Sequence, residues 1–151
     1  VIDTAGCELK EEVDDATGSR SNLGEAKLVR FMVQTLLSRG LESNEVAVIT
    51  PYNAQVEKDE EGVGQVEVRS VDGFQGREME AIVLSFVRSN EDREVGFLSD
   101  KRRINVAVTR ARRFVCIVAD SSTVGRDLFI QTLLRHAEAN GQVRSAEEFR
   151  D

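Results

Sequence analysis

Cysteine, proline and tryptophan are rare or missing in this sequence. Among its 151 residues there are two cysteines, Cys7 and Cys116, one proline and no tryptophan. Two cysteines exclude a disulfide framework and a cysteine-based zinc site, and they favour a reducing compartment, the cytoplasm or the nucleus. Because Cys116 lies inside an apolar run, we expect its thiol to be buried as a small hydrophobic group.

Long apolar runs and a surplus of positive charge are also missing. No apolar run approaches the roughly 20 residues of a membrane span, and the opening VIDTAG lacks the features of a signal peptide, so no membrane partner is expected. Lysine and arginine number 20 against 27 aspartates and glutamates, a net charge of −7. That balance argues against a general nucleic-acid coat protein, and it predicts that any contact with nucleic acid is local and salt-sensitive.

The residues that are present suit a globular α/β protein. The hydrophobic share is 40%, and the length favours one domain over residues 1–151, which begins abruptly and is expected to be a fragment of a longer protein. Near-continuous runs of valine and isoleucine predict strands buried on both faces of a parallel sheet at 46–50, 80–87 and 114–120. Alternation predicts a less buried strand at 66–71, and residues 1–3 are a candidate fifth strand.

A long amphipathic helix is predicted between the first two of these segments. Asn22 is a candidate N-cap, Glu25 follows three residues later as in a capping box, and Gly40 stands just beyond the last apolar residue. Apolar residues at helical spacing define the side expected to face the core, namely Ala26, Val29, Val33, Leu36 and Leu37.

The remaining segments complete the predicted alternation of strands and helices. The apolar spacing within 127–141 predicts a helix, and Ser145 with Glu148 predicts another capping box. The polar segments 7–21 and 57–65 are expected to be surface loops. Strands that alternate with helices predict an α/β fold, a mostly parallel sheet with helices on both faces.

The stretch RRINVAVTRARR, residues 102–113, places five arginines in twelve residues of an acidic chain. Asp100 is a candidate N-cap for a helix that runs to about Ala111, with an apolar stripe formed by Ile104, Ala107, Val108 and Ala111. At about 100° per residue, Arg103 and Arg110 fall within about 20° of each other at the border of this stripe. The packed side of the helix would therefore aim Arg110.

Two interpretations of these arginines remain open. Arginines near the carboxyl end of a helix complement its dipole, which accounts well for Arg112 and Arg113 and less well for Arg110. Alternatively, Arg110 reaches a phosphate across an interface.

Two further motifs follow predicted strands. SVDGFQGRE, residues 70–78, carries two glycines that allow close backbone approach to a ligand, together with Asp72, Gln75 and Glu78. TPYNAQ, residues 50–55, stands at the carboxyl end of a strand, where open α/β sheets bind ligands. A glycine-containing loop is by itself usually only a turn, and TPYNAQ can be a plain strand-to-helix turn with proline near the first helical position.

A metal-dependent nuclease or phosphatase is an alternative function. Asp3, Asp72 and Asp120 stand at or after predicted strand ends, where carboxylates can hold Mg²⁺, although aspartates in such places more often cap the following turn. We expect no metal ligands in this chain. His136 is expected to lie at the surface or half-buried, and Phe74 to anchor the core rather than to stack on a base.

The motifs ITPYNAQV, VRSVDGFQGREMEAIVLSFVR and GFLSDKRRINVAVTRARR, in this order, resemble the second motor domain of Upf-like superfamily 1 helicases over nearly the whole chain. The last motif is most similar to the immunoglobulin mu-binding, polymerase-alpha-associated branch. The resemblance implies a RecA-like, P-loop NTPase-type fold without its own P-loop. It also implies that ATP and Mg²⁺ are bound mainly by a first RecA-like domain of the same chain, and that the protein is a monomer.

The resemblance also implies roles for individual residues. Arg110 matches the arginine finger and Glu78 a catalytic carboxylate, and the nucleotide contacts comprise Gln75, Gly76, Glu78 and Arg110. The track for single-stranded RNA or DNA comprises Thr50, Pro51, Tyr52, Ser70 and Asp72. The whole protein would unwind in the 5′-to-3′ direction. The sequence departs from the family in two respects. GxxxxGK[ST] is missing, so the domain alone is predicted to be inactive, and the segment 56–66 is shorter than the family usually shows.

Overall fold

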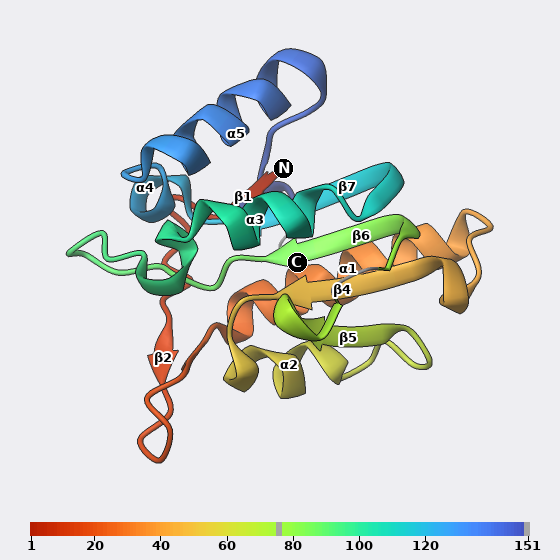
Figure 1. Ribbon diagram of the computed structural model, residues 1–151, viewed down its shortest axis with the longest axis horizontal. Helices are drawn as coiled ribbons and strands as arrows, with labels where there is room; N and C mark the ends of the chain where they lie inside the picture. Colours follow the sequence, from red (N-terminus) through yellow and green to blue (C-terminus); the bar gives the residue numbers. More distant parts are fainter. Residues whose placement is uncertain (75–76, 150–151) are drawn as a thin grey trace.

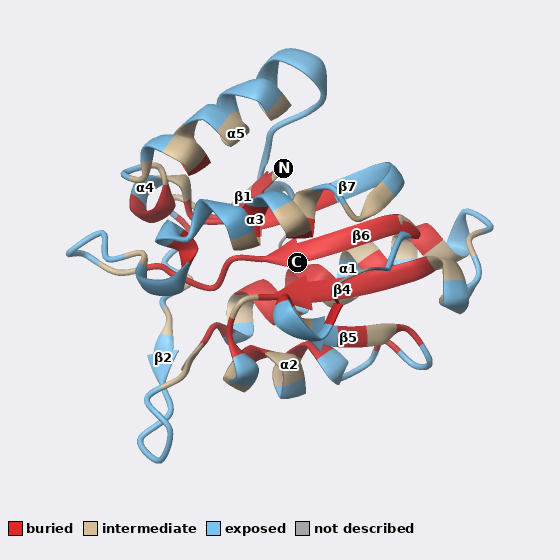
Figure 2. Cartoon of the chain, viewed as in Figure 1, coloured by how far each residue is buried: buried red, intermediate tan, exposed pale blue. Residues whose placement is uncertain are grey.

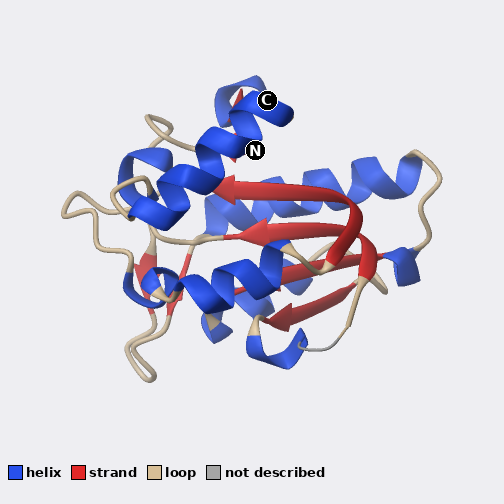
Figure 3. Cartoon of the chain, turned by 45° about the horizontal axis from the view of Figure 1, so that its top comes forward, coloured by secondary structure: helices blue, strands red, loops and turns tan. Residues whose placement is uncertain are grey.

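A parallel sheet forms the centre of the computed structural model, which describes residues 1–74 and 77–149. Within these residues the sheet has six strands in the order β5-β4-β6-β7-β1-β8, and every neighbouring pair is parallel. The arrows of the long strands point the same way in Figure 3. The strands are β1 Ile2–Asp3, β4 Val46–Thr50, β5 Glu67–Ser70, β6 Met79–Ser85, β7 Ala111–Ala119 and β8 Arg144–Ser145. All five predicted strands are confirmed.

Helices cover both faces of this sheet (Figure 1). Alternate residues of β4 point to opposite faces of the sheet and so belong to two different cores. Val46 and Val48 pack with Val29 on one face. Ile49 packs with Ile104 on the other. The first face carries α1 Leu23–Ser38 and α2 Asn53–Glu60, and the second carries α3 Lys101–Val108, α4 Ser121–Val124 and α5 Leu128–Asn140. The predicted class is confirmed: an α/β, RecA-like fold.

Short elements occupy the edges. Four 3-10 helices are described, η1 Ser43–Glu45, η2 Asp72–Phe74, η3 Gly96–Ser99 and η4 Ala146–Phe149. An antiparallel hairpin of β2 Glu12–Val13 and β3 Arg20–Ser21 projects from the body, and its tip is exposed in Figure 2. The loop predicted over 7–21 is therefore wrong in part, because two short strands pair within it.

The loop predicted over 57–65 is also wrong in its first half, which is the end of α2. The charged residues suggested a solvated segment, but Gln55 and Asp59 lie one helical turn apart and both face inward, with 0% and 1% of their surface exposed. The segment is short, yet it forms a two-turn helix that packs against α1 and β5.

The start of α1 confirms the predicted N-cap but not the predicted capping box. Asn22 caps the helix, since its Oδ1 accepts a hydrogen bond from the Glu25 N–H at 3.1 Å. The Glu25 carboxylate does not complete a capping box. It is fully buried and accepts from the Ser85 hydroxyl and the Val87 N–H, both at 3.0 Å. Glu25 therefore connects α1 to the end of β6.

The carboxyl-terminal elements differ from expectation in one respect. Helix α5 forms as predicted, with Asp127 as its N-cap, and His136 on it is exposed. The predicted capping box is wrong, because Ser145 accepts from the Glu147 N–H and Glu148 pairs with Arg144. Among residues 1–74 and 77–149, no helix is both long and apolar enough to span a membrane.

Candidate functional site at the two edges of the sheet

The predicted site residues fall at opposite edges of the sheet. Glu78 directly precedes β6 and Arg110 directly precedes β7, so both lie at the amino edge. Thr50 and Ser70 end β4 and β5, and Pro51, Tyr52 and Asp72 follow these strands at the carboxyl edge. Gln75 and Gly76 lie outside the described residues. The expected nucleotide contacts and the expected strand track are thus separate surfaces of one domain.

Arg110 is not on a helix, which corrects the sequence prediction. Helix α3 begins at the predicted cap Asp100 but ends at Val108, and Arg110 lies in the turn that leads into β7. The helix ends early because Ala111 begins the pairing with β6, opposite Met79. The apolar residue that appeared to extend the helical stripe is the first residue of a strand.

The turn still holds Arg110 beside Glu78. The Arg110 carbonyl accepts a hydrogen bond from the Met79 N–H at 3.0 Å, one residue after Glu78. The guanidinium donates through Nε to the Val106 carbonyl at 3.2 Å and through Nη2 to the Thr109 hydroxyl at 3.4 Å. These partners are neutral groups at the end of α3, so they orient the Arg110 side chain and leave its positive charge uncompensated.

The neighbouring arginines behave differently. Arg112 lies 3.4 Å from Glu78 and 3.3 Å from Glu80, and Arg113 lies 3.2 Å from Glu80. Both are on β7, so the role predicted for them at a helix terminus is wrong. Arg103 pairs with Asp72 at 3.2 Å. Within the described part of the chain, Arg110 has no carboxylate partner.

At the carboxyl edge, two of the predicted track residues are buried. Thr50 is 0% exposed and its hydroxyl has no described partner. Tyr52 is 3% exposed; its hydroxyl donates to the Val95 carbonyl at 3.2 Å and accepts from Arg88 at 3.0 Å. Both side chains are buried, which argues against the direct contact with nucleic acid that was expected of them. Pro51 and Ser70 are half-buried, and Asp72 is exposed.

A buried ion pair secures this edge, and the sequence did not reveal it. Arg88 donates to Glu11 at 2.9 Å, and both side chains are 5% exposed. Glu11 also accepts from the Ser89 N–H and from the Asn90 amide, which ties the segment before the hairpin to the segment after β6. No sequence pattern links residues this far apart, so only the fold could identify the pair.

A hollow of about 610 Å³ opens beside these residues, between the hairpin and the start of α2. Its walls include Pro51, Asn53 and Phe97, and Phe97 was not among the residues predicted from the sequence. Phe74 is buried in the second core, as expected, with only 1% of its surface exposed.

The three aspartates of the nuclease alternative do not form one site. Asp72 follows β5, whereas Asp3 is in β1; four strand spacings of about 4.8 Å put these strands roughly 19 Å apart. Asp120 caps α4 by accepting from the Ser122 N–H, and Asp3 accepts from the Ser121 N–H and hydroxyl. No group of three or more histidine, cysteine or acidic residues that could hold a metal occurs among residues 1–74 and 77–149.

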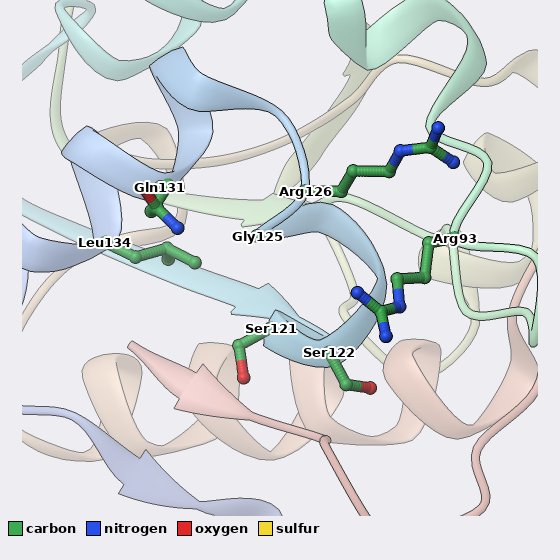
Figure 4. Close-up of a pocket in the computed structure, with 7 residues that line it drawn as sticks. All are labelled: Arg93, Ser121, Ser122, Gly125, Arg126, Gln131 and Leu134. Atoms are coloured by element: carbon green, nitrogen blue, oxygen red, sulfur yellow. The ribbon is translucent and has the colours of Figure 1, made fainter.

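Ser121 and Ser122 line a second hollow, also about 610 Å³, on the α4 side of the sheet. Figure 4 shows Ser121 and Ser122 at the start of α4, with the side chain of Arg93 reaching toward Ser122. Because the Ser121 and Ser122 hydroxyls donate to Asp3 and Asp120, they are not available to donate to an anion. Arg93 and Arg126 also line this hollow, so its free donors are guanidinium groups rather than the serine hydroxyls.

Known proteins resemble this chain closely. A family described as an AAA domain matches residues 1–122. The chain is 48% identical along its whole length to the DNA-binding protein SMUBP-2 of Rattus norvegicus, and it spans 16% of that protein. Over 94% of its length it is 42% identical to the DNA polymerase alpha-associated DNA helicase A of Saccharomyces cerevisiae, of which it spans 22%. Over 70% of its length it is 53% identical to the protein of that name in Schizosaccharomyces pombe, of which it spans 17%. The chain belongs to the AAA domains of the Upf-like superfamily 1 helicases.

Proposed function

We propose that this domain is the C-terminal motor domain of an ATP-dependent helicase that moves 5′ to 3′ along RNA or DNA. In this role it supplies the arginine finger and part of the single-strand track to a nucleotide site begun by a first RecA-like domain. The names of the similar proteins, a DNA-binding protein and two DNA helicases, support this proposal.

The observation that carries the proposal is the state of Arg110. Its guanidinium is held by the Val106 carbonyl and the Thr109 hydroxyl, beside the segment of Glu78, and no described carboxylate neutralises it. An oriented, uncompensated guanidinium at an edge of the domain suits a phosphate presented by another domain. By contrast, Arg112 and Arg113 are compensated by Glu78 and Glu80.

Phosphoryl transfer is catalysed mainly by positioning and by stabilisation of charge on the transferred group. Arg110 would donate to the phosphate oxygens, and its planar fork would hold two of them in fixed geometry, which a lysine does not do. Glu78, exposed and paired with Arg112, would act at the same edge. ATP and Mg²⁺ would be held mainly by the other motor domain, and bound Mg²⁺ would neutralise the phosphate charge there.

The strand would pass over the opposite edge of the sheet. Pro51, Ser70 and Asp72 are at or near the surface there, and the buried Thr50 and Tyr52 support them from below. The net charge of −7 leaves most of the affinity for nucleic acid to other parts of the complete protein. Closure of the two motor domains around ATP and their release after hydrolysis would then move the strand.

The isolated 151-residue domain is expected to show no Mg²⁺-dependent ATPase activity above a buffer blank, because it supplies one side of a two-sided site. The complete protein is expected to hydrolyse ATP, and single-stranded nucleic acid is expected to stimulate it. Phosphate release from both proteins at equal molar concentration measures this. Turnover by the purified domain that persists through repeated purification would contradict the proposal, and Mg²⁺-dependent cutting of nucleic acid lost in Asp72→Ala would favour the nuclease instead.

A further inference from the structure

Phe97 is an exposed aromatic ring in a position that the fold controls closely. It is 56% exposed, whereas Phe74 and Phe86 are each 1% exposed. Surface hydrophobic residues are common singly, but a large ring that is both exposed and rigidly placed is a frequent mark of a binding site. The placement of Phe97 therefore needs an explanation beyond core packing.

Three features hold the ring in place. One side of it lies against Tyr52, with ring centroids 5.4 Å apart and an interplanar angle of 31°. The Tyr52 hydroxyl is bonded to the Val95 carbonyl, two residues before Phe97, and to the buried Arg88. Gly96 has a φ of +54°, and a Cβ there would collide with the Arg88 guanidinium and approach the Tyr52 hydroxyl to 2.8 Å. The backbone just before Phe97 therefore packs against the buried polar groups of Tyr52 and Arg88.

The charges around Phe97 are unevenly distributed. The first turn of α3 brings Lys101 and Arg102, both exposed and without a carboxylate partner among the described residues, and Arg103 lies 6.0 Å from the ring centroid. The hairpin side of the hollow carries the opposite sign, with Glu12, Asp14 and Glu57 against Lys58. A strand crossing here would place its phosphates on the α3 side and its bases over the ring.

We propose that Phe97 is a stacking platform for an unpaired base of the bound strand. The inference rests on the proposed function, because it uses the same edge of the sheet. Pro51 shares the hollow with Phe97, and Arg103 joins Phe97 to Asp72 through its ion pair at 3.2 Å. The ring is thus linked to both halves of the proposed track, to Pro51 through the hollow and to Asp72 through Arg103. A base fits this place because stacking needs one open ring face and tolerates any sequence, while the cations of α3 attract the backbone.

The test measures how tightly the complete protein binds single-stranded nucleic acid. The readout is the fluorescence anisotropy of a mixed-sequence oligonucleotide, with no nucleotide present. Phe97→Ala is expected to weaken binding about 5-fold to 150-fold, the equivalent of 1–3 kcal/mol per stacked base at 1.4 kcal/mol per tenfold. Phe97→Tyr is expected to restore most of the affinity, and Phe97→Leu, which keeps apolar bulk without a π face, is not. The matched control is Phe31→Ala on α1, a ring that is 43% exposed and is expected to leave binding unchanged.

A strand of abasic nucleotides separates stacking from other roles of the ring. On that strand the wild-type protein and Phe97→Ala are expected to bind alike. An equal loss on both strands, or full affinity of Phe97→Leu, would overturn the stacking platform and make Phe97 a packing residue for another domain. Tight binding by Phe97→Ala would overturn the platform and leave the helicase proposal standing. Failure of the wild-type protein to bind any single strand would overturn both.

Discussion

Replacement of Arg110 by alanine in the complete protein is expected to lower the turnover number for ATP by a factor of about 10³ or more. At 1.36 kcal/mol per tenfold, this corresponds to a loss of at least about 4 kcal/mol of transition-state stabilisation. The charge on the transferred phosphoryl group develops in the transition state, so kcat should fall much more than KM changes. Steady-state ATPase kinetics with saturating single-stranded nucleic acid measure both constants.

The fold should survive this change. The hydrogen bonds described for the Arg110 side chain go to Val106 and Thr109 at the end of α3, so the free energy of unfolding should change by less than about 1 kcal/mol. Arg110→Lys should recover little activity, since an ammonium lacks the planar fork. Arg113→Ala is the matched control, because that side chain is 84% exposed and pairs with Glu80. Turnover of Arg110→Ala within tenfold of the wild type would show that Arg110 is not the finger.

The fold was largely predictable from local patterns. The strands of the central sheet could be located because parallel strands with both faces buried are nearly continuous in valine and isoleucine, as in β4 and β6. The caps Asn22 and Asp100 could be identified because an N-cap is a local interaction, and both accept hydrogen bonds from backbone N–H groups in the first turn of their helices.

Interactions that depend on the whole fold were not predictable. Periodicity placed Arg110 on a helix because Ala111 continues the apolar spacing, but pairing of Ala111 with Met79 in the sheet ends the helix at Val108. Glu25 fitted a capping box by spacing, yet the end of β6 brings Ser85 and Val87 to its carboxylate. In each case, a tertiary partner distant in sequence replaced the local one.

The exposure of the expected site residues was not predictable from the sequence. The motifs pointed to Thr50 and Tyr52 as track residues, but β4 and its neighbours bury both side chains. Phe97 is exposed although the sequence did not single it out, because an aromatic residue after glycine carries no signal of exposure in the sequence. The glycine at 96 is explained only by the Arg88 and Tyr52 groups that approach it.

A buried polar network between α1, α2 and the end of β6 predicts an unusual dependence of stability on pH. Glu25, Gln55 and Ser85 are each 0% exposed, and Asp59 is 1% exposed. Gln55 donates to Asp59 at 3.0 Å, while Glu25 accepts from Ser85. One carboxylate oxygen of each acid has no described partner. Burial raises the pKa of Glu25 to about 8 and that of Asp59 to about 7.

The direction of the effect follows from proton linkage. Because Glu25 has a higher pKa in the folded state than the ordinary 4.5, the folded protein binds this proton more tightly than the unfolded chain. Its contribution to stability is fully present below pH 4.5 and is lost as the pH rises to about 8. At 1.36 kcal/mol per pKa unit the loss amounts to about 5 kcal/mol. Asp59 adds a loss of the same sign up to about pH 7.

Glu25→Gln is expected to remove the Glu25 part of this loss. Glutamine keeps an oxygen that accepts from Ser85 and the Val87 N–H, and it cannot ionise. The variant should therefore gain stability relative to the wild type as the pH rises from 5 to 8, by about 1 kcal/mol per pH unit. Urea unfolding of the chain at a series of pH values measures the difference. Glu60→Gln, exposed on α2 next to Asp59, is the control and should run parallel to the wild type. Parallel curves for Glu25→Gln would mean that Glu25 is already ionised in the folded protein, with Ser85 and the Val87 N–H sufficient to hold its charge.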